Sequence, residues 1–257
     1  MVLLIIAVII IAVTGYFIFR PKKKYVEASA YILPAFTAIF NREVGFYQKL
    51  SKDGKVKFEK LAGAFLHEVR IEGVGTEITD IDRVLIASSA IIPIFGFQGW
   101  KYKNLTNIIL YPDMFDKDFQ FTGESRSILG MVGSGYMNGQ MLLSRAALVK
   151  GFSKASGKEN TAIHEFVHLL DKADGATDGI PENLLAHEYT VPWLKMMHQE
   201  MRRIQAGKSD SDPYALTNEA EFLAVASEYF LEKPEKFQHM HPELYKMLCR
   251  IFDQEPA

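Results

Sequence analysis

The sequence predicts an α+β domain, mostly helical with a small mixed sheet, that follows one N-terminal transmembrane helix. Residues 2–19 form an apolar run without charge, short apolar runs typical of strands lie in the middle of the chain, and helical spacing dominates before and after them. The 257 residues suffice for one domain of ordinary size and an appended segment. We therefore expect a membrane anchor with a basic flank over residues 1–24 and a single domain over residues 25–257.

Composition narrows the class of protein. Charged residues make up 23% and hydrophobic residues 48% of the chain, which excludes a disordered protein and a membrane protein with many spans. The formal net charge is -2, so no excess of positive charge indicates binding to nucleic acid. Cys249 is the single cysteine, so a metal site would have to rely on histidine and carboxylate ligands.

The first apolar run has the length of a membrane span. As a helix, residues 2–19 would rise about 27 Å, close to the roughly 30 Å hydrocarbon core of a bilayer. The basic sequence RPKKK follows the run, whereas a secretory signal carries its positive charges before it. The positive-inside tendency then predicts a single-pass protein of a bacterial-type cell membrane with its domain in the cytoplasm. An external domain behind an uncleaved signal anchor is the alternative.

Helical spacing marks the first part of the domain. One helix within residues 25–51 is expected to lead from the membrane into the domain, and a second covers residues 55–73 with Gly73 as its stop. A third begins after Thr79, whose side chain suits an N-cap, and continues through a nearly all-apolar stretch that indicates a buried helix.

Strands are predicted in the middle of the chain and helices after it. The run NIILYP over residues 107–112 indicates one strand, and the glycine-rich residues 127–149 indicate two strands around an Asn-Gly turn. Four further helices are expected over residues 158–175, 193–205, 217–233 and 242–254, the first of them capped near Asn160 and stopped at Gly175.

The sequence HEFVH in the first of these helices indicates metal chemistry. Residues four apart lie on one face of a helix, so His164 and His168 can present ring nitrogens to one ion. Glu165 lies one step round the helix and can reach a water on that ion without binding the ion itself, as a zinc hydrolase requires. The flanking residues are apolar, and buried imidazoles need a partner that a shared cation supplies. Two core histidines bonded to carbonyl oxygens are the alternative.

A catalytic zinc needs a third protein ligand, which must come from farther along the chain. Asp174 stands where a third histidine would follow in related motifs. The sequence TNEAEFLAVASEYF offers Glu219, Glu221 and Glu228. Seven residues make almost two helical turns, so Glu221 and Glu228 share one helix face and spacing leaves both open.

The sequences HEFVHLLD, YALTNEAEFLAVASEYF and PELYKMLCRIFDQEP together resemble the Mlc titration factor A family of zinc peptidases. The resemblance extends through RVLIASSA, IILYP and GQMLLS and covers residues 50–255. It implies a zincin-like metalloprotease domain of the gluzincin type that binds one Zn²⁺ through His164, His168 and Glu221, with Glu165 as the general base. Action as an aminopeptidase and cleavage within a chain both stay open.

The resemblance and the spacing also single out residues around the ligands. The segment is similar to the catalytic domain of anthrax lethal factor, which implies that Tyr214 stabilises the transition state; packing in its loop is the alternative. Asp171 either fixes the tautomer of a ligand histidine or caps its helix, and Glu228 either supports a ligand or joins two helices. Val225 stands four residues after Glu221, where such peptidases often place an aspartate.

These residues predict hydrolysis of a peptide or protein substrate. Glu165 would accept a proton from the attacking water and pass it to the leaving amine, and the strand GQMLLS would pair with an extended substrate as an edge strand. A function of a different class is the alternative, namely a zinc-containing membrane protein that sequesters a transcriptional regulator or another partner. The presence of Glu165 favours the enzyme. A structural zinc site would need a fourth protein ligand, which the sequence does not supply.

Overall fold

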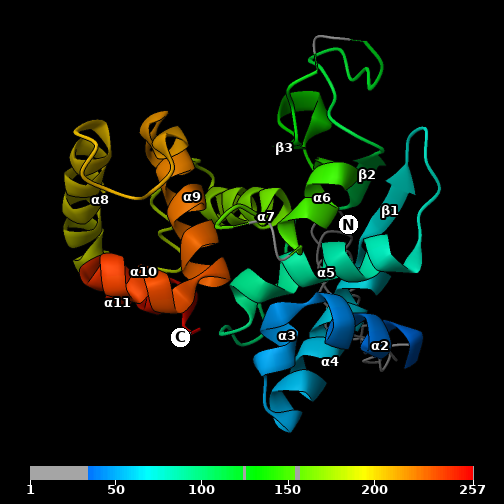
Figure 1. Cartoon of the computed structure of the whole chain (residues 1–257), viewed down its shortest axis with the longest axis horizontal. Coiled ribbons are helices and arrows are strands. Elements are labelled where there is room, and N and C mark those ends of the chain that lie inside the picture. The colour runs from blue at the N-terminus through cyan, green and yellow to red at the C-terminus, as the bar shows by residue number, and fades with distance from the viewer. Residues whose placement is uncertain (1–33, 124–125, 154–156, 257) are drawn as a thin grey trace, which may run out of the picture. The chain divides into compact units, whose positions relative to one another are not determined.

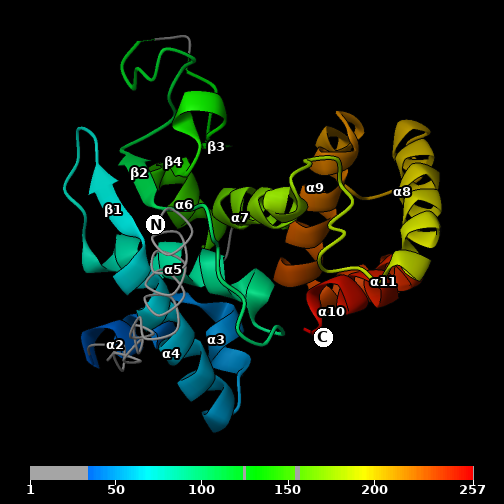
Figure 2. The same ribbon diagram turned by 180° about the vertical axis from the view of Figure 1, so that it is seen from behind.

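The fold is arranged around the helix α7 (Thr161–Asp171), which lies between a small sheet and a group of C-terminal helices (Figures 1 and 2). The computed structural model describes residues 34–123, 126–153 and 157–256. The predicted membrane span and the boundary between residues 24 and 25 lie outside these ranges. Within them, no helix combines the length and the apolar character that crossing a bilayer would require.

The sheet has four strands in the order β1-β2-β4-β3. Their bounds are β1 (Arg70–Gly73), β2 (Asn107–Tyr111), β3 (Gly130–Val132) and β4 (Gln140–Ser144). β1 and β2 are parallel, β2 and β4 are parallel, and β3 runs antiparallel to β4. The expected α+β class with a small mixed sheet is therefore confirmed.

β4 is an interior strand, so the prediction that GQMLLS forms a free edge is wrong. β4 pairs with β2 on one side and β3 on the other, and Met141 and Leu143 are buried in the core. Within the part of the chain that the structure describes, β3 leaves one edge unpaired next to α7, and directly before it Ile128 forms a single bridge with Phe115. Any strand added to the sheet on this side would therefore pair with β3.

The N-terminal helices pack against one another through aromatic side chains. Their bounds are α2 (Pro34–Glu43), α3 (Gly45–Lys49), α4 (Lys52–Glu68) and α5 (Asp80–Ile94). Phe40, Tyr47 and Phe58 form one cluster with ring centroids 5.3–5.5 Å apart. α4 ends at Glu68, so the predicted continuation to Gly73 is wrong: Arg70–Gly73 instead pairs with β2 as β1.

α5 begins as predicted and is buried along most of its length. Thr79 and Asp82 form a reciprocal capping box, which satisfies backbone donors at the start of the helix. Asp82 also binds Arg145, the first residue of α6 (Arg145–Gly151), with an oxygen–nitrogen distance of 2.7 Å. The two strands predicted within residues 127–149 are confirmed as β3 and β4, but the end of that stretch, from Arg145 onward, is helical.

The C-terminal part is helical, as expected. It contains α8 (Thr190–Gln205), α9 (Glu219–Glu232), α10 (Pro234–Met240) and α11 (Pro242–Phe252), of which α10 was not predicted. α9 packs directly against α7, and α10 and α11 pack against the end of α9 (Figure 1). Asn160 caps α7 through its side chain, and Gly175 ends the turn after α7 with a φ of 109°, as the sequence predicts.

Gly179 joins the ends of three helices. Its backbone N–H donates to Asp171 Oδ2 over 2.9 Å, and its carbonyl oxygen accepts from Trp193 Nε1 over 2.7 Å. Its φ is +76°, and a Cβ at this position would lie 2.3 Å from the carbonyl oxygen of Glu219. The end of α7, the start of α8 and the start of α9 therefore converge on a residue without a side chain.

We expect Gly179→Ala to lower the free energy of unfolding by about 2–4 kcal/mol, because a left-handed backbone and a backbone clash act together. Urea unfolding measures this change. Gly207→Ala is the matched control, because Gly207 has a φ of +65° but no neighbouring atom within 4 Å of the added Cβ. An equal loss in both variants would show that the contact with α9 has no effect on stability.

Candidate metal centre

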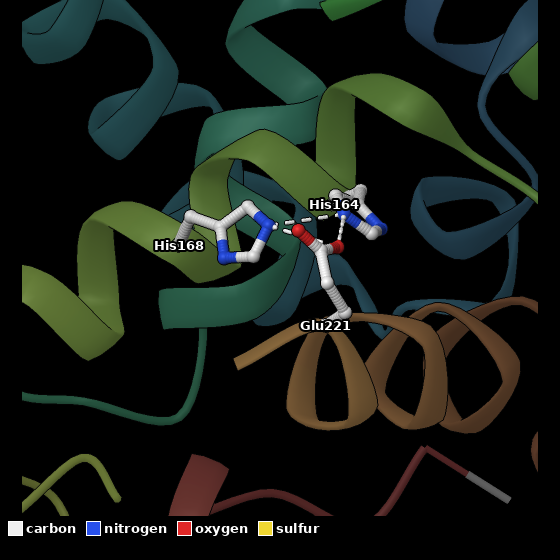
Figure 3. A group of neighbouring side chains, drawn as sticks. All are labelled: His164, His168 and Glu221. Atoms are coloured by element: carbon white, nitrogen blue, oxygen red, sulfur yellow. Dashed lines mark hydrogen bonds and ion pairs between the residues drawn. The ribbon is translucent and has the colours of Figure 1, made fainter. Parts of the chain in front are cut away.

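α7 and α9 bring the three predicted metal ligands together (Figure 3). His164 and His168 project from successive turns of α7, and Glu221 faces them from the first turn of α9. His164 Nε2 lies 2.9 Å from Glu221 Oε2 and 3.0 Å from His168 Nε2, while His168 Nε2 lies 3.4 Å from the same carboxylate oxygen. One ligand atom of each residue thus points to a common centre.

The distances and the charges of this group fit a zinc ion. Ligand atoms of a tetrahedral zinc site lie about 3.3–3.4 Å apart when the metal–ligand bonds are about 2.0–2.1 Å. Burial acts to lower the pKa of His164, but hydrogen bonds with Glu221 and Glu228 outweigh it and raise this pKa to about 10. Burial acts to raise the pKa of Glu221, but both histidines outweigh it and hold this pKa at about 2. The carboxylates therefore favour a positive charge at this point, which a proton on His164 or a divalent metal ion would supply.

Glu228 holds the other ring nitrogen of His164. Its Oε1 lies 2.6 Å from His164 Nδ1, and its Oε2 accepts from the backbone N–H of Asn160 over 2.5 Å. If Nδ1 of a neutral His164 carries the proton, Nε2 presents its lone pair to the metal. Of the two glutamates that spacing left open, the structure places Glu221 among the ligand atoms and Glu228 behind His164.

Asn160 caps the start of α7 with one hydrogen bond and connects it to α9 with two others. Its side-chain oxygen accepts from the backbone N–H of Ile163 over 3.2 Å, and its side-chain nitrogen donates to Glu232 Oε1 over 2.8 Å. Its backbone N–H binds Glu228. The sequence predicts only the helix cap, because the other two partners lie about 70 residues away.

Asp171 binds the loop rather than a ligand. Its Oδ2 accepts from the backbone N–H of Gly179, whereas its Oδ1 and His168 Nδ1 are both buried without a hydrogen-bond partner among the described residues. Burial raises the pKa of Asp171 to about 6 against the effect of the bond from Gly179. The observed bond corresponds to neither role predicted for Asp171, because it anchors the loop at Gly179 to the end of α7.

Glu165 lies between α7 and the free edge of the sheet. It is 7% exposed, and a Cβ at Gly130 of β3 would lie 2.8 Å from its Oε1. A glycine at position 130 therefore allows the edge strand to approach this carboxylate. Burial raises the pKa of Glu165, although His164 and His168 act to lower it, so the carboxylate is a stronger base than an exposed glutamate.

Tyr214 lies beside the metal centre on a short 3-10 helix, η4 (Pro213–Leu216). Its ring centroid is 6.0 Å from that of His164, and the residue is 55% exposed. Burial and the neighbouring carboxylates raise the pKa of Tyr214, so its phenol keeps its proton at neutral pH. It can therefore donate a hydrogen bond into the site.

A cavity of about 890 Å³ opens next to Glu165 and Tyr214. Its walls are formed by β3 and the residues before it, by α7 and the residues before it, by the link before η4, and by α9. Leu129 and Val225 give it apolar surface. Val225 thus lines this cavity, and it is Glu228 that supports the ligand histidine.

Comparison with known proteins agrees with this geometry. Residues 19–253 match the family described as glucose-regulated metallo-peptidase M90. The chain belongs to this family. The M90 assignment supports a metallopeptidase-like protein and confirms the resemblance to the Mlc titration factor A family.

Individual relatives of this M90 chain span nearly the same length. It is 28% identical over 234 residues to the uncharacterized protein slr2042 of Synechocystis, covering 87% of this chain and 85% of the relative. It is 29% identical over 224 residues to Mlc titration factor A of Klebsiella pneumoniae strain 342, covering 80% and 82%. Mlc titration factor A of Escherichia fergusonii is 29% identical over 222 residues, with the same coverage.

We expect Glu221 and Glu228 to differ in their effect on metal binding by this M90 protein. Glu221→Ala should abolish binding of zinc, and Glu228→Gln should weaken it by about 10–100-fold, as for other residues that orient a ligand. Mass spectrometry of the purified chain and chelator competition measure content and affinity. Glu219→Gln is the control, because Glu219 lies on the same helix but pairs with His198. Full zinc in Glu221→Ala would exclude this residue as a ligand.

We expect Glu232→Gln to stabilise the fold at high pH only. Burial raises the pKa of Glu232 from 4.5 to about 7, so the folded state binds more protons than the unfolded state between these values. Stability is thus lost as the pH rises through this window, by on the order of 1–3 kcal/mol. Urea unfolding at about pH 5 and about pH 8 should show a gain for Glu232→Gln only at the higher pH. Glu243→Gln, at a side chain 72% exposed, is the control, and an equal gain at both pH values would contradict the explanation.

Proposed function

We propose that this protein is a zinc-dependent peptidase anchored by its N-terminal segment in a bacterial cell membrane, with the catalytic domain on the cytoplasmic side. The observation that carries this proposal is the convergence of His164, His168 and Glu221 beside a buried carboxylate, Glu165, at a free strand edge. The basic residues after the apolar run support the orientation.

Each residue of the site has a chemical task in this proposal. When bound by His164, His168 and Glu221, zinc supplies Lewis acidity that polarises the scissile carbonyl and acidifies the attacking water. Glu165 accepts the proton of that water and delivers it to the leaving amine, for which its raised pKa is suited. Tyr214 donates its phenol proton in a hydrogen bond to the oxyanion. Glu228 keeps His164 in one tautomer.

The free edge of β3 offers a binding site for an extended peptide. Between β3 and β4, the backbone N–H of Ser144 donates to the carbonyl oxygen of residue 129, and that of Gly133 donates to the carbonyl oxygen of residue 140. Because the direction of the backbone groups alternates along a strand, those of Gly130 and Val132 point away from β4. A substrate strand that pairs with these groups passes beside Glu165. A neighbouring substrate side chain then enters the cavity, whose wall is apolar at Leu129 and Val225 and charged at Lys158 and Asp210.

The test of this proposal is the variant Glu165→Gln, which preserves shape but removes the base. We expect it to keep about one zinc per chain and to lose peptide hydrolysis by about 10²–10⁴-fold. Cleavage of a mixed peptide library by the purified full chain, followed by mass spectrometry, also reports whether cuts fall at amino termini or internally. Glu243→Gln is the control, because Glu243 is exposed and pairs with Lys246. Full activity of Glu165→Gln would exclude Glu165 as the base.

A second candidate function is sequestration of a regulatory protein. The name of the relatives, Mlc titration factor A, favours it, because it indicates binding to a protein named Mlc. A binding role does not require Glu165, so partner binding that survives in Glu165→Gln without any hydrolysis by the parent chain would favour this second function.

A further inference from the structure

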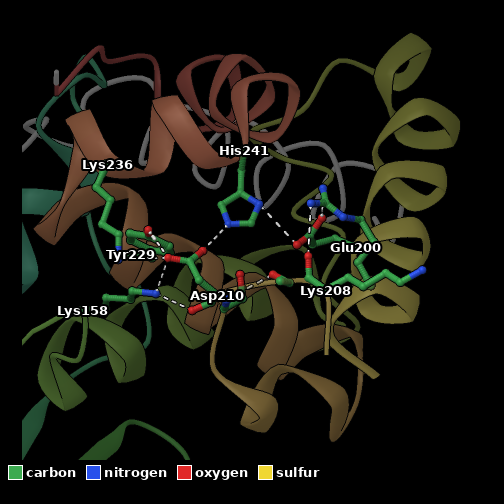
Figure 4. Close-up of polar contacts among 10 residues, drawn as sticks. Lys158, Glu200, Lys208, Asp210, Tyr229, Lys236 and His241 are labelled. Carbon is green, nitrogen blue, oxygen red and sulfur yellow. Dashed lines mark hydrogen bonds and ion pairs between the residues drawn. The ribbon is translucent and has the colours of Figure 1, made fainter. Parts of the chain in front are cut away.

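The carboxylate of Asp210 collects four hydrogen-bond donors (Figure 4). It accepts from Lys158 Nζ over 2.8 Å, from the hydroxyl of Tyr229 over 2.7 Å and from His241 Nε2 over 2.8 Å. Lys236 Nζ lies 3.1 Å from it. Asp210 itself lies in the link between α8 and η4, so its partners hold a segment without regular structure of its own.

These partners belong to the parts of the fold that surround the metal centre. Lys158 lies two residues before the N-cap of α7, and it also bonds to the backbone carbonyl oxygen of Asp210. Tyr229 lies on α9, one residue after Glu228. Lys236 and His241 come from α10 and the junction with α11. One carboxylate thus ties the link to both ligand helices and to the helices that support them.

Three of the four donors to Asp210, namely Lys158, Lys236 and His241, are basic groups. His241 is 3% exposed and lies between Asp210 and Glu200, whose Oε1 is 3.3 Å from His241 Nδ1. Burial acts to raise the pKa of Asp210 and to lower that of His241, but the bonds between the charged groups outweigh burial in both cases. Lys158 Nζ also lies 4.1 Å from the centre of the Tyr229 ring. Charge-assisted bonds of this kind are stronger than those between neutral groups.

A short and stiff connection leads from Asp210 to Tyr214. Only Ser211, Asp212 and Pro213 separate them, and the proline ring fixes one backbone angle. The side chain of Asp212 accepts from the backbone N–H of Tyr214 over 2.8 Å. Tyr214 is 55% exposed, so contacts of its ring fix its position only weakly. The position of its phenol therefore depends on the backbone of this link.

We propose that Asp210 is a positioning residue that holds Tyr214 beside the metal centre. Its carboxylate fixes the link to Lys158 and Tyr229, and the link in turn fixes η4 and the phenol. The catalytic consequence rests on the proposed peptidase function, because Tyr214 acts there on the oxyanion. The positional consequence does not depend on catalysis and can be measured in the chain alone.

A double-mutant cycle on the full chain tests the catalytic consequence. Asp210→Asn should lower kcat by about tenfold with KM and zinc content close to those of the parent, because it acts through Tyr214. In the Tyr214→Phe background the same substitution should have no further effect on kcat. A further tenfold loss in that background, or a rise in KM at unchanged kcat from direct contact with substrate, would overturn the proposal.

Hydrogen exchange tests the positional consequence without any activity. The backbone N–H groups of Tyr214, Ala215 and Thr217 are bonded within this segment, so they should exchange about tenfold faster in Asp210→Asn while those of α7 and α9 stay as in the parent. Tyr229→Phe removes one donor to Asp210 and keeps the ring, so it should increase the exchange rate by a smaller factor. This variant replaces Asp210→Asn in the test if Asp210→Asn does not fold. Glu243→Gln is the control. Unchanged exchange at Tyr214 in both Asp210→Asn and Tyr229→Phe would overturn the proposal.

The two measurements separate the two proposals. A parent chain that hydrolyses no peptide but shows faster exchange at Tyr214 in Asp210→Asn would refute the peptidase and support the positioning by Asp210. A parent chain that hydrolyses peptides, with additive effects in the cycle, would support the peptidase and refute the positioning.

Discussion

The candidate metal centre depends on one contact between two helices, in which two carboxylates of α9 enclose the ring of His164. Glu228 binds Nδ1 at 2.6 Å and Glu221 faces Nε2 at 2.9 Å. When the proton of a neutral ring is on Nδ1, two acceptors face each other on the other side, which is unfavourable unless a positive charge lies between them. The preference for a positive charge at this point, carried by a proton or by a metal ion, thus arises from the pairing of α7 with α9 and not from the HEFVH sequence alone.

The surroundings of this contact leave α9 little freedom to move. Gly179 fits against its first turn, Asn160 bonds to its last two turns through Glu228 and Glu232, and Tyr229 bonds to the link that carries Tyr214. These contacts reach α9 from the loop after α7, from the start of α7 and from the link after α8. Rigid support of this kind is what a site needs if its ligands are to keep a productive geometry.

Local patterns in the sequence predict the parts of the site that lie within one helix, and tertiary contacts decide the rest. Spacing places His164, Glu165 and His168 on α7, but it cannot separate Glu221 from Glu228, because only the docking of α9 distinguishes two residues on one helix face. Val69 and Ile71 are apolar residues two apart, as in a strand, but the helical spacing of apolar residues continues up to Val69. Pairing with β2 makes Arg70–Gly73 a strand. The order of the strands, which places β3 at the edge, and the partners of Asp210 are set by contacts between distant residues.

Asn160 also has a consequence for how the site is assembled. Its side chain caps α7, while its backbone and its amide nitrogen bind α9. The first turn of α7 therefore acquires all its bonding partners only after residues about 70 positions later in the chain have docked. A peptide around HEFVH would contain both histidines. It would lack Glu228, which fixes the orientation of the His164 ring. The three candidate ligands thus reach this geometry only when α9 has packed against α7.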